Sequence, residues 1–191
     1  MHKTRLEAFS DGVLAIIITI MVLELKVPRG SDLGALRPLL PALASYALSF
    51  LMLAIYWNNH HHLFQAVQKV NGRILWANMH LLFWLSLVPF VTGWMGENHF
   101  AAETVAIYAT VLLLAAIAYF ILVRALLAHH GADSTLARAM GSDFKGKVSV
   151  LIYAAAIAAA WKWPALGITL CFVVSLIWLV PDRRIEDTLS R

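Results

Sequence analysis

Long apolar blocks, separated by short polar segments, run through the whole chain of 191 residues. A membrane-spanning helix needs about 20 mostly apolar residues, because each residue adds about 1.5 Å and the hydrocarbon layer is about 30 Å thick. Six blocks approach this length, and they cover residues 9–27, 38–67, 74–96, 104–123, 148–161 and 163–180. The pattern predicts an all-α integral membrane protein with six transmembrane helices, and we expect residues 1–191 to form one domain.

Two of these blocks depart from the standard length. The second is longer than a span requires, so we expect it to tilt or to project beyond the bilayer. The fifth is short and rich in alanine, which favours close packing against a neighbouring helix in lipid. Pro89 near the outer end of the third block is the strongest helix breaker inside any of them.

Composition agrees with a membrane protein and narrows its partners. The chain is 61% hydrophobic and 14% charged, whereas a soluble domain has about a quarter charged residues. The net charge of +4 is spread over short loops rather than along a stripe, so no nucleic acid is expected as a partner. The single cysteine, Cys171, excludes an intrachain disulfide.

The basic residues indicate how the chain is oriented. With six spans and the N-terminus inside, most of the 15 Lys and Arg residues fall in inner segments. These residues are Lys3, Arg5, Lys69, Arg73, Arg124, Arg138, Lys145, Lys147, Arg183, Arg184 and Arg191. The positive-inside rule then favours a multi-pass protein of the cell's plasma (inner) membrane with both termini in the cytoplasm.

The first block is too polar to be an ordinary lipid-facing span. Only twelve uncharged residues separate Asp11 from Glu24, which as a helix is roughly 18 Å. At least one carboxylate must therefore lie in or near the apolar layer, where a charge costs at least about 2.5 kcal/mol. A helix of this kind is surrounded by protein or borders water, and such charges typically mark ion or substrate pathways.

The helical period gives this segment a distinct face. At 100° per residue, the residues on one face are Arg5, Phe9, Gly12, Ile16, Thr19, Ile20, Leu23 and Val27. Ser10 and Asp11 point away from it, toward other helices. Periodicity alone leaves a second interpretation open, in which the face is apolar core and Thr19 bonds back to its own helix.

Three motifs along the chain resemble one known family. Residues Arg5 to Asp11 read R-L-E-A-F-S-D, residues Tyr56 to His61 read Y-W-N-N-H-H, and Asn78 follows Trp76 with Pro89-Phe90 further along. Together they resemble the first three helices of the transmembrane protein 175 family, the lysosomal-type potassium channels and their bacterial relatives. The resemblance implies a potassium-preferring cation channel whose pore is lined by the first helix. The chain has no T-V-G-Y-G sequence for a carbonyl filter.

The resemblance also implies pore residues, and these fall on the face found from periodicity. Ile16 would form the narrowest hydrophobic constriction, Ile20 and Leu23 would follow one and two turns further out, and Thr19 would be the polar member of the path. A hydrophobic constriction can gate by dewetting. Preference for potassium over sodium could come from dehydration at Ile16 or from coordination by the Thr19 hydroxyl, and the sequence leaves both open.

A polar bracing network is expected beside the pore, because charges within a membrane must be paired or hydrogen-bonded. Its expected members are Arg5, Phe9, Ser10 and Asp11 of the first segment, Trp57 and either His60 or His61 of the second, and Asn78 of the third. We interpret this network as mainly architectural, fixing the tilt of the first helix. A direct role in permeation is the less favoured alternative.

The helix count indicates an oligomer. Animal members of the family carry two six-helix repeats, and one six-helix chain supplies a single first helix, which cannot ring a pore alone. If two repeats dimerise in animal members, a homotetramer is expected here, because closed symmetry is the common outcome for identical chains.

Other kinds of function are less well supported. His60, His61 and His62 are consecutive, so their side chains diverge by about 100° and cannot share one metal ion. We therefore expect no metal and no cofactor, only permeant potassium, while a histidine that titrates near neutral pH could tune the channel. The chain contains no nucleophile elbow or phosphate loop, so an enzyme is not expected. The alternative function is a proton-coupled or proton-permeable transporter that uses Asp11 and the histidines.

Overall fold

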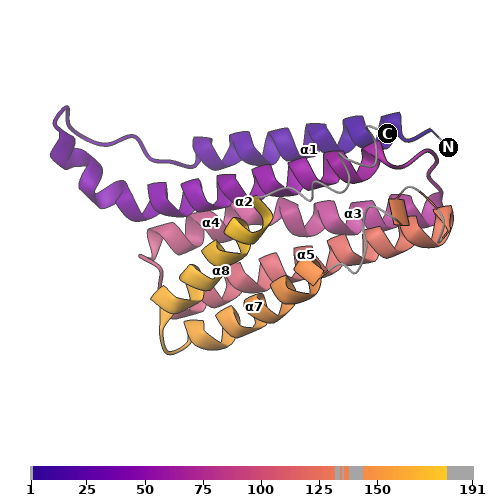
Figure 1. Cartoon of the computed structure of the whole chain (residues 1–191). Helices are drawn as coiled ribbons and strands as arrows, with labels where there is room; N and C mark the ends of the chain where they lie inside the picture. The colour runs from indigo at the N-terminus through magenta and orange to yellow at the C-terminus, as the bar shows by residue number, and fades with distance from the viewer. Residues whose placement is uncertain (1, 132–133, 135, 138–143, 180–191) are drawn as a thin grey trace.

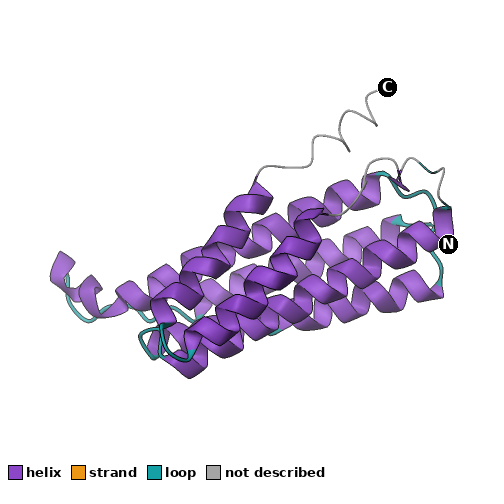
Figure 2. Ribbon diagram, turned by 60° about the horizontal axis from the view of Figure 1, so that its bottom comes forward, coloured by secondary structure: helices purple, strands orange, loops and turns teal. Residues whose placement is uncertain are grey.

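The computed structural model of the chain describes residues 2–131, 134, 136–137 and 144–179, and these form a bundle of helices (Figures 1 and 2). In chain order the elements are α1 (Thr4–Leu23), the 3-10 helix η1 (Leu33–Leu39), α2 (Leu40–Gln65), α3 (Gly72–Ser86), α4 (Val88–Glu97), α5 (Ala102–His130), α7 (Phe144–Ala160) and α8 (Pro164–Leu179). The second predicted segment corresponds to η1 with α2, and the third to α3 with α4. The all-helical prediction is confirmed.

Four of the helical segments are long and apolar enough to cross a membrane: Thr4–Leu23, Leu33–Gln65, Gly72–Glu97 and Ala102–His130. A shorter apolar helix, α8, follows α7 in a tight hairpin. The chain is therefore a membrane protein. Within this hairpin a Cβ on Gly167 would lie 3.0 Å from the Cβ of Ala160, so α7 packs closely against its neighbour, as its alanine content predicts.

The first helix begins and ends earlier than the predicted range of 9–27. It starts at Thr4 and its last residue is Leu23, with Glu24 as C-cap. Val27 precedes Pro28, and a residue before proline is disfavoured in the helical conformation, so the predicted place of Val27 on the helix is wrong. The fourth predicted segment, which ended at residue 123, continues as α5 to His130, so Arg124 lies within a helix.

The third segment is two helices rather than one. Helix α3 ends at Ser86 and α4 begins at Val88, with Leu87 at the break. Pro89 lies in the first turn of α4, where its missing N–H leaves no helical hydrogen bond unmade. Proline was identified in the sequence as a breaker, but the break falls before it, because the proline ring clashes with the preceding turn.

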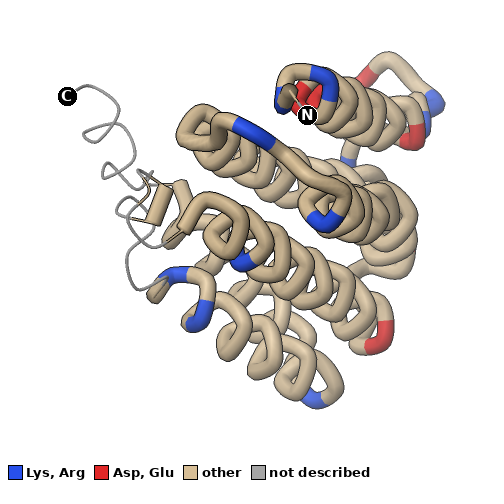
Figure 3. Tube along the Cα trace, turned by 90° about the vertical axis from the view of Figure 1, so that its right-hand side faces the viewer, with Lys and Arg blue, Asp and Glu red and all other residues tan. Residues whose placement is uncertain are grey.

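Helix α1 lies at the margin of the bundle. It packs against α2, α3 and α4, while α5 packs against α3, α4, α7 and α8 in the interior. Figure 1 shows α1 and the α7–α8 hairpin on opposite sides, and the view along the helices in Figure 3 also places α1 at the edge. One long flank of α1 is therefore left without cover from its own chain.

The end of the bundle that carries the start of α1 also carries the end of α2, the start of α3 and the end of α5 (Figure 1). Lys3, Lys69 and Arg73 lie at this end, which the sequence analysis predicts to be the cytoplasmic one. Several other basic residues used for that prediction, namely Arg138, Arg183, Arg184 and Arg191, are outside the described residues, and so is residue 180 of the sixth predicted segment.

Candidate functional site

The buried residues of α1 are regularly spaced along one flank of the helix. Leu6, Ser10, Leu14, Ile17 and Met21 are buried, and their spacing of three or four residues places them on one stripe of the helix. This stripe faces α2, α3 and α4. The rest of the helix surface remains open.

The opposite flank of α1 is apolar and exposed. Every residue of the predicted face is exposed: Arg5, Phe9, Gly12, Ile16, Thr19, Ile20, Leu23 and Val27. Ile16 is 59% exposed and Leu23 is 82% exposed. This excludes the interpretation of the face as ordinary core of the single chain, so in the membrane it meets lipid, water or another chain.

Thr19 interrupts this face with one hydroxyl group. Its Oγ1 donates a hydrogen bond of 2.9 Å to the backbone carbonyl of Ile16, although the side chain is exposed. The bond to its own helix, one of the two interpretations of Thr19, is therefore present. It uses the only proton of the hydroxyl and leaves the oxygen free to accept or to coordinate.

A buried chain of hydrogen bonds connects α1, α3 and α2. The Asn78 amide nitrogen donates to Ser10 Oγ at 2.9 Å, and Ser10 Oγ donates to the Leu6 carbonyl at 2.8 Å. His60 Nε2 lies 2.8 Å from Asn78 Oδ1. Because that amide oxygen can only accept, His60 donates from Nε2. All three side chains are buried, so these hydrogen bonds lie away from water.

A second, exposed contact links α1 to α2. Trp57 Nε1 donates to Asp11 Oδ1 at 2.9 Å, and the indole of Trp57 stacks on the His61 ring with the centroids 5.6 Å apart. The structure thus brings the two adjacent histidines to different partners. His60 joins the buried chain, and His61 stands over Trp57 at the surface.

Arg5 and Phe9 stand apart from these contacts. Both are exposed, and among the described residues Arg5 makes no hydrogen bond or ion pair. Phe9 is 51% exposed on the open flank of α1. Their predicted place in a bracing network is therefore not accounted for by contacts within one chain.

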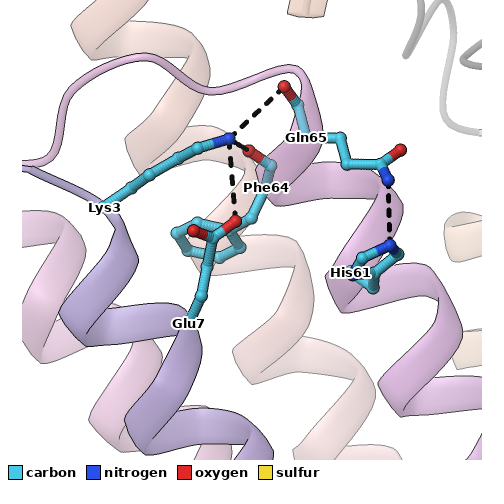
Figure 4. A network of polar contacts seen from close by, with 5 residues as sticks. All are labelled: Lys3, Glu7, His61, Phe64 and Gln65. Carbon is cyan, nitrogen blue, oxygen red and sulfur yellow. Dashed lines mark hydrogen bonds and ion pairs between the residues drawn. The ribbon is translucent and has the colours of Figure 1, made fainter.

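The first residues of α1 are tied to the end of α2 by contacts that the sequence analysis did not anticipate (Figure 4). Lys3 Nζ donates to the carbonyls of Phe64 and Gln65 and lies 3.6 Å from a Glu7 carboxylate oxygen. The Gln65 amide nitrogen lies 2.9 Å from His61 Nε2. The opposite charges of Lys3 and Glu7 at a spacing of four residues were a visible signal for part of this cluster.

The three consecutive histidines do not converge. Within the part of the chain that the structure describes, no group of three or more His, Cys, Asp or Glu side chains could hold a metal ion. The polar groups near α1 are arranged as pairs and short chains between helices. Such an arrangement can fix the position of α1, and the residues of its open flank take no part in it.

Known proteins similar to this chain indicate its family. The family model of the endosomal/lysosomal potassium channel TMEM175 matches residues 5–89. A Chryseobacterium protein (strain P1-3) named as a potassium channel is 56% identical over 190 residues, covering 100% of this chain and 99% of the relative. The chain belongs to the TMEM175 family. Members of this family are ion channels rather than enzymes.

Two further relatives define how far the likeness extends. The crystal structure of a lysosomal potassium-selective channel TMEM175 homolog from Chamaesiphon minutus matches with a TM-score of 0.81 and 29% identity, covering 94% of this chain and 97% of that one. The mouse protein, named an endosomal/lysosomal proton channel, is 29% identical over 96 residues. This match covers 48% of our chain and 19% of the mouse protein, so the TMEM175 likeness to animal members is confined to part of each.

Proposed function

We propose that this chain is a potassium-preferring channel that conducts passively along α1, with Ile16 as its narrowest constriction. The observation that carries the proposal is the exposed apolar flank of α1 in a chain whose other α1 flank is packed and hydrogen-bonded. The names of the bacterial relatives and of the Chamaesiphon structure support potassium as the permeant ion.

The pore requires several copies of the chain. One protomer contributes a single α1, at its margin, so the flank of Ile16, Thr19, Ile20 and Leu23 can enclose a path only where copies meet around an axis. A homotetramer, one channel domain per chain, is the arrangement we propose. Both termini would lie in the cytoplasm, with the chain in the plasma membrane.

Constriction by Ile16 would act through dehydration. A ring of isoleucine side chains offers no hydrogen bonds to water, so it excludes hydrated ions unless it widens. The oxygen of Thr19, about one turn away, has donated its proton to the helix and can still coordinate a cation. The Ser10–Asn78–His60 chain and the Asp11–Trp57 bond would then set the tilt of α1 and, through it, the radius at Ile16.

Substitution of Ile16 by asparagine tests the proposal. In vesicles loaded with potassium, Ile16→Asn should raise the passive flux at least about tenfold, the change expected when a barrier falls by about 1.4 kcal/mol. It should also weaken discrimination against sodium. Leu151→Asn is the control, because Leu151 is 70% exposed on α7, on the other side of the bundle. Unchanged flux in a folded Ile16→Asn protein would remove Ile16 from the pore.

A second candidate function is proton permeation or proton-coupled transport that uses Asp11 and the α2 histidines. The observation in its favour is that the mouse relative is named a proton channel. The same vesicles separate the two functions. Potassium flux that needs a proton gradient and moves no net charge would support the transporter, whereas flux driven by the potassium gradient alone supports the channel.

A further inference from the structure

A wide groove opens at the end of the bundle opposite the N-terminus, between the last turn of α1, the start of α2, and α4. Its volume is about 760 Å³, and its lining includes Met21, Glu24, Tyr46, Phe90, Trp94 and Glu97. Sites for small organic groups commonly measure about 300–1,000 Å³. The groove is therefore much larger than a potassium ion requires.

The groove holds one carboxylate without a partner in the described chain. Lys26 Nζ lies 2.6 Å from a Glu97 carboxylate oxygen, so these two charges neutralise each other. Among the described residues the Glu24 carboxylate makes no hydrogen bond or ion pair, and only the backbone N–H of Glu24 is bonded, to Ile20. The remaining charge of the groove is therefore negative.

The Glu24 carboxylate lies over the backbone of α4 because residue 93 is glycine. A Cβ at Gly93 would be 3.2 Å from Glu24 Oε2, closer than ordinary contact. The missing side chain thus makes room for the carboxylate within the groove. The Glu24 carboxylate is therefore placed where a positively charged group of a ligand could pair with it.

Aromatic side chains make up part of the groove wall. The rings of Phe90 and Trp94 stack with their centroids 6.2 Å apart and 22° between planes, and Tyr46 lies in the same lining. An aromatic face attracts an organic cation, and a tryptophan does so most strongly. Carboxylate and aromatic rings together are a typical environment for an ammonium group.

The groove is also continuous with the membrane-spanning surface. Met21 and Ala42 of its lining belong to segments that are long and apolar enough to cross a membrane, and Leu25 lies two residues after one of them. An occupant would therefore have its charged part beside Glu24 and its apolar part along these side chains. We propose that this groove binds a phospholipid whose headgroup carries an ammonium group, an interaction that does not depend on where the pore lies.

Native mass spectrometry of the intact protein tests this. The protein is released from micelles containing phosphatidylethanolamine, phosphatidylcholine or phosphatidylglycerol with the same acyl chains. The two lipids with ammonium groups should be retained about fivefold more than phosphatidylglycerol, the effect of a single exposed ion pair. Glu24→Gln should abolish this preference, and Gly93→Leu should do so by filling the space beneath the carboxylate.

The control is Glu103→Gln, which removes an exposed carboxylate at the start of α5, at the same end of the bundle. It should keep the lipid preference of the parent. Equal retention of the three lipids, or a preference that survives Glu24→Gln, overturns the proposal. Disulfide formation between copies of a Gly93→Cys protein would also overturn the proposal, because a second chain would then cover the groove. The native Cys171 is buried and should not interfere.

Discussion

Two adjacent histidines of α2 lie in different environments and have different partners. His60 is buried and donates to Asn78, whereas His61 is exposed over Trp57. The sequence predicted that one of them joins a network, because both lie in a polar motif. It left the choice open, since the choice depends on the rotation of α2 about its axis, which is set by packing against α4 and α1.

Asn78 is the residue whose removal should cost most. Asn78→Leu leaves His60 Nε2 without its acceptor in a buried site, and an unsatisfied group of this kind costs about 1–3 kcal/mol. It also removes the donor to Ser10 Oγ, which keeps its own bond to the Leu6 carbonyl. We expect a clear loss of stability, measured by thermal unfolding in detergent. Trp57→Phe is the comparison, because its bond to Asp11 is exposed, and it should change stability far less. If the two variants lost the same amount of thermal stability, the buried Ser10–Asn78–His60 hydrogen bonds would not stabilise the fold more than the exposed bond does.

At the scale of helices, periodicity predicted faces well and ends poorly. The face of α1 depends only on 100° per residue, and all its predicted members are exposed. The ends depend on individual turns: Pro28 follows the end of α1, and the break at Leu87 lies two residues before Pro89. Sequence reasoning identified Pro89 as a breaker but did not use Pro28, and it could not place the turn at which either helix ends.

A buried cluster of hydroxyl groups was also beyond prediction. Ser49 Oγ lies 2.7 Å from Thr92 Oγ1 and 3.0 Å from the Tyr108 hydroxyl oxygen, and the cluster joins α2, α4 and α5. Serine and threonine occur throughout the apolar blocks, and most of them bond to their own helix. Nothing in the sequence separates these three from the rest, because their meeting depends on how the helices cross.

Helix α4 packs against α2 through a glycine. A Cβ at Gly96 would lie 2.8 Å from the Cα of Ala42 and 2.5 Å from Ser45 Oγ. Gly96→Ala must therefore push two backbones apart, and overpacking of this kind costs about 1–3 kcal/mol. Gly72→Ala, at a position with nothing within 4 Å, is the control and should be tolerated. The midpoint of thermal unfolding measures both, and an unaffected Gly96→Ala protein would show that α2 and α4 are not so close.

At the scale of the whole molecule, one side of the chain, the apolar flank of α1, is left exposed. The fold of the single chain was largely predictable, because six apolar blocks with these lengths leave few alternatives. The contacts between copies of the chain were not predictable, because the sequence of an exposed helix face does not show what covers that face. Because α1 lies at the margin of the bundle, contacts between copies are best tested on this helix.

Leu23→Cys provides this test. Leu23 is 82% exposed near the end of α1, and the native Cys171 is buried. If the α1 helices converge on one axis, mild oxidation should give dimers linked between chains. Leu151→Cys, on the far side of the bundle, should give few. Native mass spectrometry of the uncrosslinked protein should give the mass of four chains, and a monomer in native lipid would contradict the proposed assembly.

The hydrogen bonds of α1 have a consequence for biosynthesis. Asp11 bonds to a residue 46 positions later, and Ser10 to one 68 positions later. At roughly 5–20 residues per second of translation, Asn78 follows Ser10 by about 3–14 s. During this interval the Ser10 hydroxyl can bond only to the Leu6 carbonyl of its own helix, and for the first part of it the Asp11 carboxylate has no Trp57 to accept from. We therefore expect the first helix to reach its final place in the bilayer only after α2 and α3 have been synthesised.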